Sequence, residues 1–266
     1  MKNDFIFDGQ RLSDFGYIIV DFNSSTGVTT SNVSKMSYTD VKAPLSHKSH
    51  NVSTTYDENL SKQIQIMKNH CMDDNIEITN DDLSQLSRWL CRTDYKQFKW
   101  IDDKDDDEIF YNVKIDLSKI ELGDTVGFEL NITSDSQFGY TRDIKNVMDF
   151  TGTTENTINV YSDDEGIIYP DVIITIKENG DLNLINGREP NRSTYISDCK
   201  ENEIITIIGG DTLQISSNLE TRDFSNTFNY KCPRLVSKYR DYYNAFTCNL
   251  KCIIEIKYRG IRKVGI

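Results

Sequence analysis

The stretch FIFDGQRLSDFG, residues 5–16, gives the chain an unusually patterned start. Phe5 and Phe7 lie two positions apart, which is the period of a β-strand, and the Asp-Gly dipeptide that follows favours a tight turn with positive φ. Residues 17–20, YIIV, are again rich in strand-forming side chains. We therefore predict that a hairpin-like unit opens the chain and ties the N-terminus into a sheet.

Strand-like alternation continues through the first half of the chain. Ile64 and Ile66 share one face in SKQIQIMKN, and FYNVKIDL places three apolar side chains on one face, at positions 111, 113 and 115. One segment, TNDDLSQLSRWLCR, breaks this pattern with leucines at helical spacing, at positions 83, 86 and 90. Thr79 and Asp82 form an N-cap signature before them. We predict a single helix near residues 80–92.

The 266-residue chain is long enough for two domains, each with its own core. Ser, Asp and Gly residues follow the strand-like run that ends near residue 134, so we place a boundary near residue 140. Beyond it the pattern is almost wholly β, with predicted hairpin turns at Asn179-Gly180 and at Gly209-Gly210-Asp211. The prediction is a mainly β protein: a β-rich first domain with one helix over 1–140, and a second domain over 141–266 that is a sandwich or a jelly roll.

The formal net charge of −12 disfavours binding to nucleic acid, because such binding depends on Lys and Arg at the phosphates. The first 140 residues carry 24 acidic against 14 basic side chains, net −10, and the remainder carries 18 against 16, net −2. No apolar run has the length of a membrane span, and the first ten residues lack the apolar core of a signal peptide. We expect a protein made and folded in a cytoplasm, without membrane association.

The six cysteines, at positions 71, 91, 199, 232, 248 and 252, are expected to be reduced and mostly buried. Cys248 and Cys252, in CNLKC, are spaced to share one face of a strand; this spacing matches neither a zinc knuckle nor a CxxC redox pair. The acidic run over 102–108 lacks the glycine and the ligand spacing of an EF-hand loop. It is better explained as a solvated hairpin tip. We predict no metal and no cofactor.

No catalytic set stands out. His47 and His50 lie in a Ser- and Lys-rich stretch expected to be a solvated loop, and neither they nor His70 accompany a known catalytic motif. We predict no catalytic residues and no enzymatic activity. Aromatic residues cluster in TFNY and in KYRDYYNAF, the latter at positions 239, 242, 243 and 246. They fit strand packing best, but exposed they would form a sugar-stacking face or a protein interface.

With these motifs in view, the chain resembles the distal tail protein family of long-tailed bacteriophages over nearly its whole length. The opening FIFDGQRLSDFG is similar to that family's Phe-x-Phe-x-Gly…Ser-x-x-Phe-Gly start. LSQLSRWL, followed by FKWIDDKDDDEIFYNVKI, resembles its helix ending in Trp-Leu and the hairpin after it. DSQFGYT resembles its interdomain junction, although Gln137 stands where a proline is common. GIIYPDVIITI and the segment 228–260, which ends in Tyr258 and Arg259, resemble strands of its second domain.

This resemblance implies a structural protein of the virion, six copies of which form a ring at the tail tip. The ring would be assembled in the cytoplasm of the host bacterium. The resemblance implies that the first domain is a β-sandwich with one helix and closes the ring. It also implies a galectin-like second β-sandwich domain of jelly-roll type that projects from the ring, and no inserted sugar-binding module. The implied partners are five further copies of the chain, the tail tube protein, and a tail-associated lysin or a fibre or receptor-binding protein. DNA would pass through the ring without specific binding.

Two other functions compete with this one. The tyrosines of the second half favour a carbohydrate-binding module for cell-wall glycans, and any β-sandwich with two suitably placed carboxylates could be a glycosidase or an esterase. The 42 acidic residues are too many to single out such a pair from the sequence.

Overall fold

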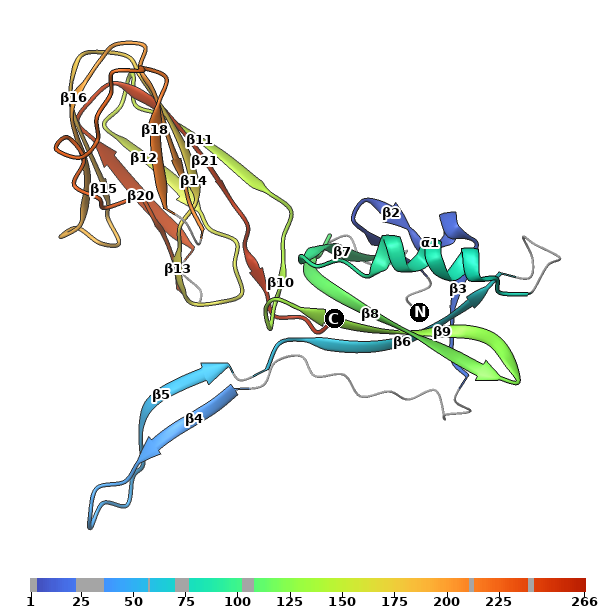
Figure 1. The fold of residues 1–266 in the computed structure, drawn as a ribbon. Coiled ribbons are helices and arrows are strands. Elements are labelled where there is room, and N and C mark those ends of the chain that lie inside the picture. Colours follow the sequence, from blue (N-terminus) through green and yellow to red (C-terminus); the bar gives the residue numbers. More distant parts are fainter. Residues whose placement is uncertain are drawn as a thin grey trace. The chain divides into compact units, whose positions relative to one another are not determined.

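The computed structural model describes residues 4–22, 36–56, 58–69, 77–101, 108–210, 213–238 and 242–266. The fold is mainly β with one α-helix, as predicted (Figure 1). The chain divides into two compact units: unit 1 comprises residues 1–140 and 262–266, and unit 2 comprises residues 141–261. No described helix has the length or apolar character needed to cross a membrane.

Unit 1 is built on one antiparallel sheet of seven strands, in the order β2-β1-β7-β8-β9-β6-β3. The strands are β1 (Asp4–Phe7), β2 (Gln10–Arg11), β3 (Tyr17–Val20), β6 (Ser61–Lys68), β7 (Lys96–Ile101), β8 (Tyr111–Leu122) and β9 (Asp124–Ser134). A 3-10 turn, η1 (Leu12–Phe15), joins β2 to β3. The side chains that the two-residue period assigns to one face, at positions 64 and 66 of β6 and at 111, 113 and 115 of β8, are all buried.

The opening stretch enters the sheet by two separate strands. Asp8 and Gly9 have φ of 51° and 80°, and they turn β1 back onto β2. Only glycine takes such angles freely, which explains Gly9. The second β-rich run does not pair with the first, contrary to the prediction: β3 pairs with β6 at the opposite edge of the sheet. Strands β7, β8, β9 and β6 lie between the two runs in the sheet.

The helix α1 (Asn80–Leu90) lies close to its predicted position and packs on this sheet. Trp89 makes the central contacts: its ring stacks on Phe15 with centroids 4.2 Å apart and on Phe5 at 5.9 Å. Its indole Nε1 donates a 3.0 Å hydrogen bond to the carbonyl of Phe7, so the buried polar atom is satisfied. The N-terminal strand is therefore held by the helix as well as by its neighbours in the sheet.

The predicted N-cap is a complete capping box. The Asp82 amide donates to Thr79 Oγ1 at 3.2 Å, and the Thr79 amide donates to Asp82 Oδ2 at 2.7 Å. Lys68 Nζ lies 2.9 Å from the same carboxylate. Partial burial acts to raise the pKa of Asp82, but the bonds from Lys68 and Thr79 outweigh it and hold that pKa below its ordinary value.

We expect Thr79→Ala to lower the free energy of unfolding by about 1 kcal/mol, because it leaves an amide of the first helical turn without its acceptor. Chemical denaturation followed by circular dichroism measures this loss. Ser84→Ala, an exposed change within the same helix, is the matched control and should leave stability within about 0.5 kcal/mol. Equal effects of the two substitutions would contradict the role of the cap.

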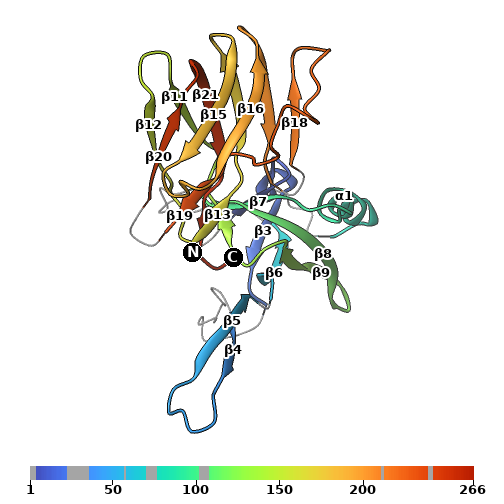
Figure 2. The same cartoon turned by 90° about the vertical axis from the view of Figure 1, so that its left-hand side faces the viewer.

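Unit 2 is a sandwich of two sheets, in the orders β11-β21-β14-β17-β18 and β12-β20-β15-β16 (Figures 1 and 2). The five-stranded sheet contains β11 (Ile144–Asp149), β14 (Asp171–Ile176), β17 (Ile204–Ile208), β18 (Gln214–Ser217) and β21 (Cys252–Tyr258). The four-stranded sheet contains β12 (Glu155–Asn159), β15 (Gly180–Asn186), β16 (Ser193–Cys199) and β20 (Tyr243–Cys248). Inward side chains of both sheets form one apolar core, including Ile174, Leu184, Phe246 and Ile254.

Two of the tight turns in unit 2 cross between sheets. Asn179-Gly180, predicted to be a hairpin turn, lies between β14 and β15, which belong to different sheets, so that prediction is wrong. The CNLKC stretch also connects the two sheets: Cys248 ends β20 and Cys252 begins β21. The prediction that these two cysteines share one face of a single strand is therefore wrong. Gly209-Gly210 does lie in the connection of a hairpin, between β17 and β18, and Asp211 is outside the described residues.

The remaining strands are short. β13 (Gly166–Ile168) pairs with β19 (Leu235–Ser237), and the chain passes between the units at β10 (Gly139–Tyr140) and β22 (Ile261–Arg262). Unit 1 also takes up the last five residues, which the sequence-based division places in the second domain. Tyr111 Oη donates to the carbonyl of Gly265 at 3.0 Å, and Ile266 is buried in the core of unit 1.

Candidate assembly surface

The most exposed regular element of unit 1 is a hairpin of β4 (Met36–Val41) and β5 (His50–Tyr56). Every residue of β5, and every residue of β4 except Ser37, is exposed. Among the described strands, β4 and β5 pair only with each other and form a separate two-stranded sheet (Figure 1). An isolated two-stranded hairpin is marginally stable in water, so an element of this kind gains stability when another surface covers it.

One face of this hairpin is apolar. Met36 lies opposite Tyr56, and Tyr38 lies opposite Thr54. Val52 has no paired partner on β4, because the register shifts by one residue between Ser53 and Asn51. Tyr38 and Val52 keep 59% and 65% of their surface exposed. Leu45, in the connecting turn, is fully exposed. This face presents the kind of apolar surface that marks a site of protein association.

The base of the hairpin is fixed to other parts of unit 1. The Tyr56 and Phe138 rings meet edge to face with centroids 4.8 Å apart. Lys263 Nζ donates to Tyr56 Oη at 3.1 Å and lies over both rings, 5.7 Å and 5.5 Å from their centroids. The hairpin is thus held at one end, while the apolar residues farther along it stay exposed.

The hairpin carries a slight positive charge within an acidic half of the chain. Residues 36–56 contain Lys42, Lys48 and two histidines against the single acid Asp40, whereas residues 1–140 have net charge −10. His47 and His50 are exposed, as expected; His47 lies in the connecting turn, and His50 begins β5 rather than a loop. An apolar hairpin with a formal charge of +1 is compatible with an acidic protein surface.

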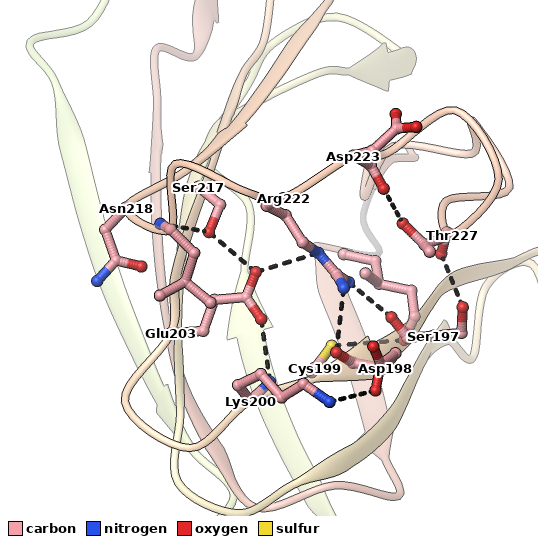
Figure 3. A network of polar contacts seen from close by, with 12 residues as sticks. Ser197, Asp198, Cys199, Lys200, Glu203, Ser217, Asn218, Arg222, Asp223 and Thr227 are labelled. Carbon is pink, nitrogen blue, oxygen red and sulfur yellow. Dashed lines mark hydrogen bonds and ion pairs between the residues drawn. The ribbon is translucent and has the colours of Figure 1, made fainter.

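Unit 2 holds a buried polar network around Glu203 (Figure 3). The Glu203 side chain is fully buried; its carboxylate accepts from the Lys200 amide at 3.0 Å and from Ser217 Oγ at 2.9 Å. Arg222 Nε lies 3.2 Å from Glu203 Oε1, and the rest of its guanidinium donates to the carbonyls of Ser197 and Asp198, at 2.6 Å and 3.0 Å. All these partners belong to the protein itself. The network therefore ties the segment around Arg222 to β16, to β18 and to the turn between β16 and β17, so its role is structural.

Asp143 and Glu189 make three further ion pairs in unit 2. Asp143 contacts Lys257 Nζ at 2.9 Å and Arg259 Nε at 2.7 Å, and these hydrogen bonds hold its pKa below the ordinary value. Glu189 pairs with both ends of the Arg234 guanidinium, which likewise lowers the pKa of Glu189. Both carboxylates are engaged in packing the sandwich.

The residues considered at the sequence level as sites are scattered. His70, Cys71, Tyr239 and residues 102–107 of the acidic run lie outside the described residues. Glu108, at the end of that run, pairs with Lys99 at 2.8 Å. Within the described ranges, no group of three or more His, Cys, Asp or Glu side chains is arranged to hold a metal ion. The two aromatic clusters, TFNY and KYRDYYNAF, contain both buried and exposed residues. Phe228 and Phe246 lie in the core, whereas three tyrosines are exposed, at positions 230, 242 and 243.

Sequence analysis missed both the exposed hairpin and the Glu203–Arg222 pair. The hairpin had a detectable signal: residues 36–56 alternate weakly and carry few long apolar side chains, which is unusual for a strand pair that a core covers. Glu203 had none, because one glutamate among 42 acidic residues gives no sign of burial.

Comparison with known proteins agrees with this architecture. The crystal structure of the distal tail protein Dit of phage SPP1, described as a paradigm of hub adsorption apparatus in phages that infect Gram-positive bacteria, matches with a TM-score of 0.64 and 10% identity over 97% of this chain and 98% of that one. The phage P2 baseplate in its Ca-activated conformation matches with a TM-score of 0.45 and 10% identity over the same shares of the two chains. A search of curated proteins finds no match.

Family models cover nearly the whole sequence. The phage tail protein N-terminal domain matches residues 1–136, and the phage tail C-terminal domain matches residues 138–258. The fold that the SPP1 protein shares extends across both regions. The similarity to phage tail proteins inferred from the sequence motifs is therefore confirmed, and the chain belongs to the family of phage tail proteins that these two domains define.

Proposed function

We propose that this phage tail protein is a structural hub subunit, that six copies close into a ring at the tail tip, and that it carries out no chemistry. The observation that carries the proposal is the β4–β5 hairpin, whose exposed apolar face has no covering strand among the described residues. The fold shared with SPP1 Dit, a protein whose structure is described as a hub, supports the same role.

The occupant of the hairpin's apolar face would be the next copy of the chain. A contact between two different surfaces of identical subunits is heterologous, and such contacts build rings when the rotation closes. The hairpin, with its two lysines and two histidines, meets an acidic surface on any copy, since residues 1–140 carry net charge −10. Burial of the apolar face would supply most of the binding free energy. The charge difference between the hairpin and the acidic surface of the next copy would orient the two subunits.

The other partners follow from the tail-tip position. The tail tube protein would contact one side of the ring, and a tail-associated lysin, fibre or receptor-binding protein would contact the other. The acidic half of the chain would form a channel that repels DNA phosphates, so DNA would pass without binding. The protein would be assembled into the tail in the host cytoplasm and would then be part of the virion.

We expect association of the purified protein to increase with salt. Subunits of net charge −12 repel one another, whereas the hairpin segment 36–56 has a formal charge of only +1, so screening removes more repulsion than attraction. Light scattering and native mass spectrometry across a salt series, at micromolar concentration, would show smaller species at low salt and hexamers at high salt. Tetramers, or open filaments, would contradict the six-membered ring.

A purified protein that stays monomeric at every salt concentration would require a second measurement. Incubation with assembled tail tubes, followed by electron microscopy, would show whether a ring forms on the tube. Absence of six-fold density at the tube end would refute the proposal.

The alternative function, a carbohydrate-binding module, rests on the exposed tyrosines of unit 2. Tyr230 and Tyr243 keep 64% and 48% of their surface exposed, and Tyr195 on β16 bonds to Asp181 at 2.8 Å. Such polar and aromatic surfaces stack on sugars in binding modules. Calorimetric titration with host cell-wall polysaccharide distinguishes the two functions: the hub requires no heat of binding, and a module requires saturable heat that Tyr195→Ala or Tyr243→Ala reduces.

A further inference from the structure

We propose that Cys248 and Cys252 form a redox-responsive pair, and that a hydroperoxide converts their thiols into a disulfide that staples the two sheets of unit 2 together. This inference goes beyond the proposed hub function and does not depend on it. It concerns a modification site within one subunit.

The geometry brings these two thiols together from opposite layers of the sandwich. Cys248 is the last residue of β20 in the four-stranded sheet, and Cys252 is the first residue of β21 in the five-stranded sheet. Their sulfur atoms lie 3.7 Å apart, in hydrogen-bond contact, and both side chains are buried. Cys199 and Cys232 are also buried, but in the described structure neither has a thiol hydrogen-bonded to its sulfur.

The surroundings make Cys248 the sulfur that reacts first. Cys248 belongs to the lining of an open surface pocket of about 480 Å³, together with the Thr151–Thr154 stretch, Glu178 and Lys251, so a small oxidant can come close to this residue. The contact between the two sulfurs, in which either thiol can donate, lowers the pKa of Cys248 and raises the pKa of Cys252, so Cys248 is the favoured thiolate. The thiolate is the nucleophilic form of cysteine.

The reaction is balanced with hydrogen peroxide as the oxidant. The Cys248 thiolate attacks one peroxide oxygen, the O–O bond breaks, and hydroxide leaves, so Cys248 becomes a sulfenic acid. The Cys252 sulfur then attacks Cys248 Sγ, the S–O bond breaks, and the Cys252 proton and the displaced hydroxide form water. Overall, two thiols lose two electrons and two protons, and one peroxide becomes two water molecules. The sulfurs must approach from 3.7 Å to about 2.05 Å, which side-chain rotation across a three-residue connection can supply.

The test uses the full chain, purified with reductant and then freed of it. The protein is exposed to hydrogen peroxide, denatured, alkylated with N-ethylmaleimide and measured by mass spectrometry. We expect two of the six cysteines to lose their alkylation, and peptide mapping to link positions 248 and 252. Cys232→Ser, which alters another buried thiol of the same core, is the control and should form the same link.

The variant Cys252→Ser separates the two steps. Without its partner, the Cys248 sulfenic acid should persist and be captured by dimedone at that position, while Cys248→Ser should give neither dimedone capture at 252 nor a link. Circular dichroism of each variant verifies that it is folded. Full alkylation of all six cysteines after peroxide treatment, or a link that joins a different pair, would overturn the proposal.

Stability gives an independent readout of the staple. The oxidised wild-type protein should melt roughly 5 °C above its reduced form, because the link restricts the unfolded chain, and reductant should reverse the difference. Cys248→Ser should show no peroxide-dependent shift. An identical melting temperature for oxidised and reduced wild type, in a sample whose link has been verified, would refute a stapling role.

Discussion

A protein carrying Tyr38→Asp and Val52→Asp should remain folded and monomeric under conditions in which the wild-type protein would form the proposed ring. Both side chains are more than half exposed on the β4–β5 hairpin, so the substitutions remove no core contact. In an assembled ring they would bury two carboxylates without partners, and each unpaired buried charge costs several kcal/mol. Six interfaces would be affected at once, which makes this the largest expected effect on assembly.

Native mass spectrometry at the salt concentration that favours the wild-type hexamer measures the change. The matched control is Ser37→Asp with Thr39→Asp, which adds two charges to the opposite face of the same strand and should preserve the ring. A melting temperature within a few degrees of the wild type confirms that the hairpin variant is folded. If the variant assembles as well as the wild type, the hairpin is not the ring contact.

The largest expected effect on stability comes from Arg222→Met. Glu203 is fully buried and Arg222 nearly so, with 7% of its side chain exposed. Removing the cation leaves a buried carboxylate with only the Lys200 amide and the Ser217 hydroxyl as partners. Breaking a buried ion pair by removing one member costs about 3–5 kcal/mol, enough to threaten the folding of unit 2. Thermal and urea unfolding should show a large loss for unit 2.

Two variants make that prediction specific. Lys200→Met removes a neighbouring but exposed ion pair with Asp198, and it should change stability by less than about 1 kcal/mol. The double variant Glu203→Leu with Arg222→Met removes both charges and should recover most of the loss, because no unpaired charge remains. If the double variant is less stable than Arg222→Met by a further 3 kcal/mol, the two side chains act independently and the ion pair is not the cause.

Local patterns predicted the helix and the faces of many strands. The helix α1 needs only its own residues: the Thr79–Asp82 capping box and the apolar positions that recur every three or four residues. Buried positions in β6 and β8 follow from a two-residue alternation that the backbone imposes on any strand. These features depend on neighbours within about one turn or one strand, so the sequence contains all the information that they require.

Strand pairing was not predictable in the same way. Asn179-Gly180 and Gly209-Gly210 both look like hairpin turns, yet the first joins opposite sheets and the second joins adjacent strands. β3 follows closely after β1 in the chain but lies at the other edge of its sheet. The partner of a strand depends on contacts with residues far away in the sequence, and a turn dipeptide specifies only the local change of direction.

The sequence by itself determined the mainly β composition, the position of α1 and, through motifs spread along the chain, membership of a phage tail family. Only the tertiary structure decided which polar and sulfur atoms meet. It buries Glu203 against Arg222 and places the Cys248 and Cys252 sulfurs 3.7 Å apart from two different sheets, although their spacing in the chain matches no redox motif. The physical reason is that burial and contact are set by the packing of distant strands, whereas backbone periodicity and capping are set by neighbouring residues.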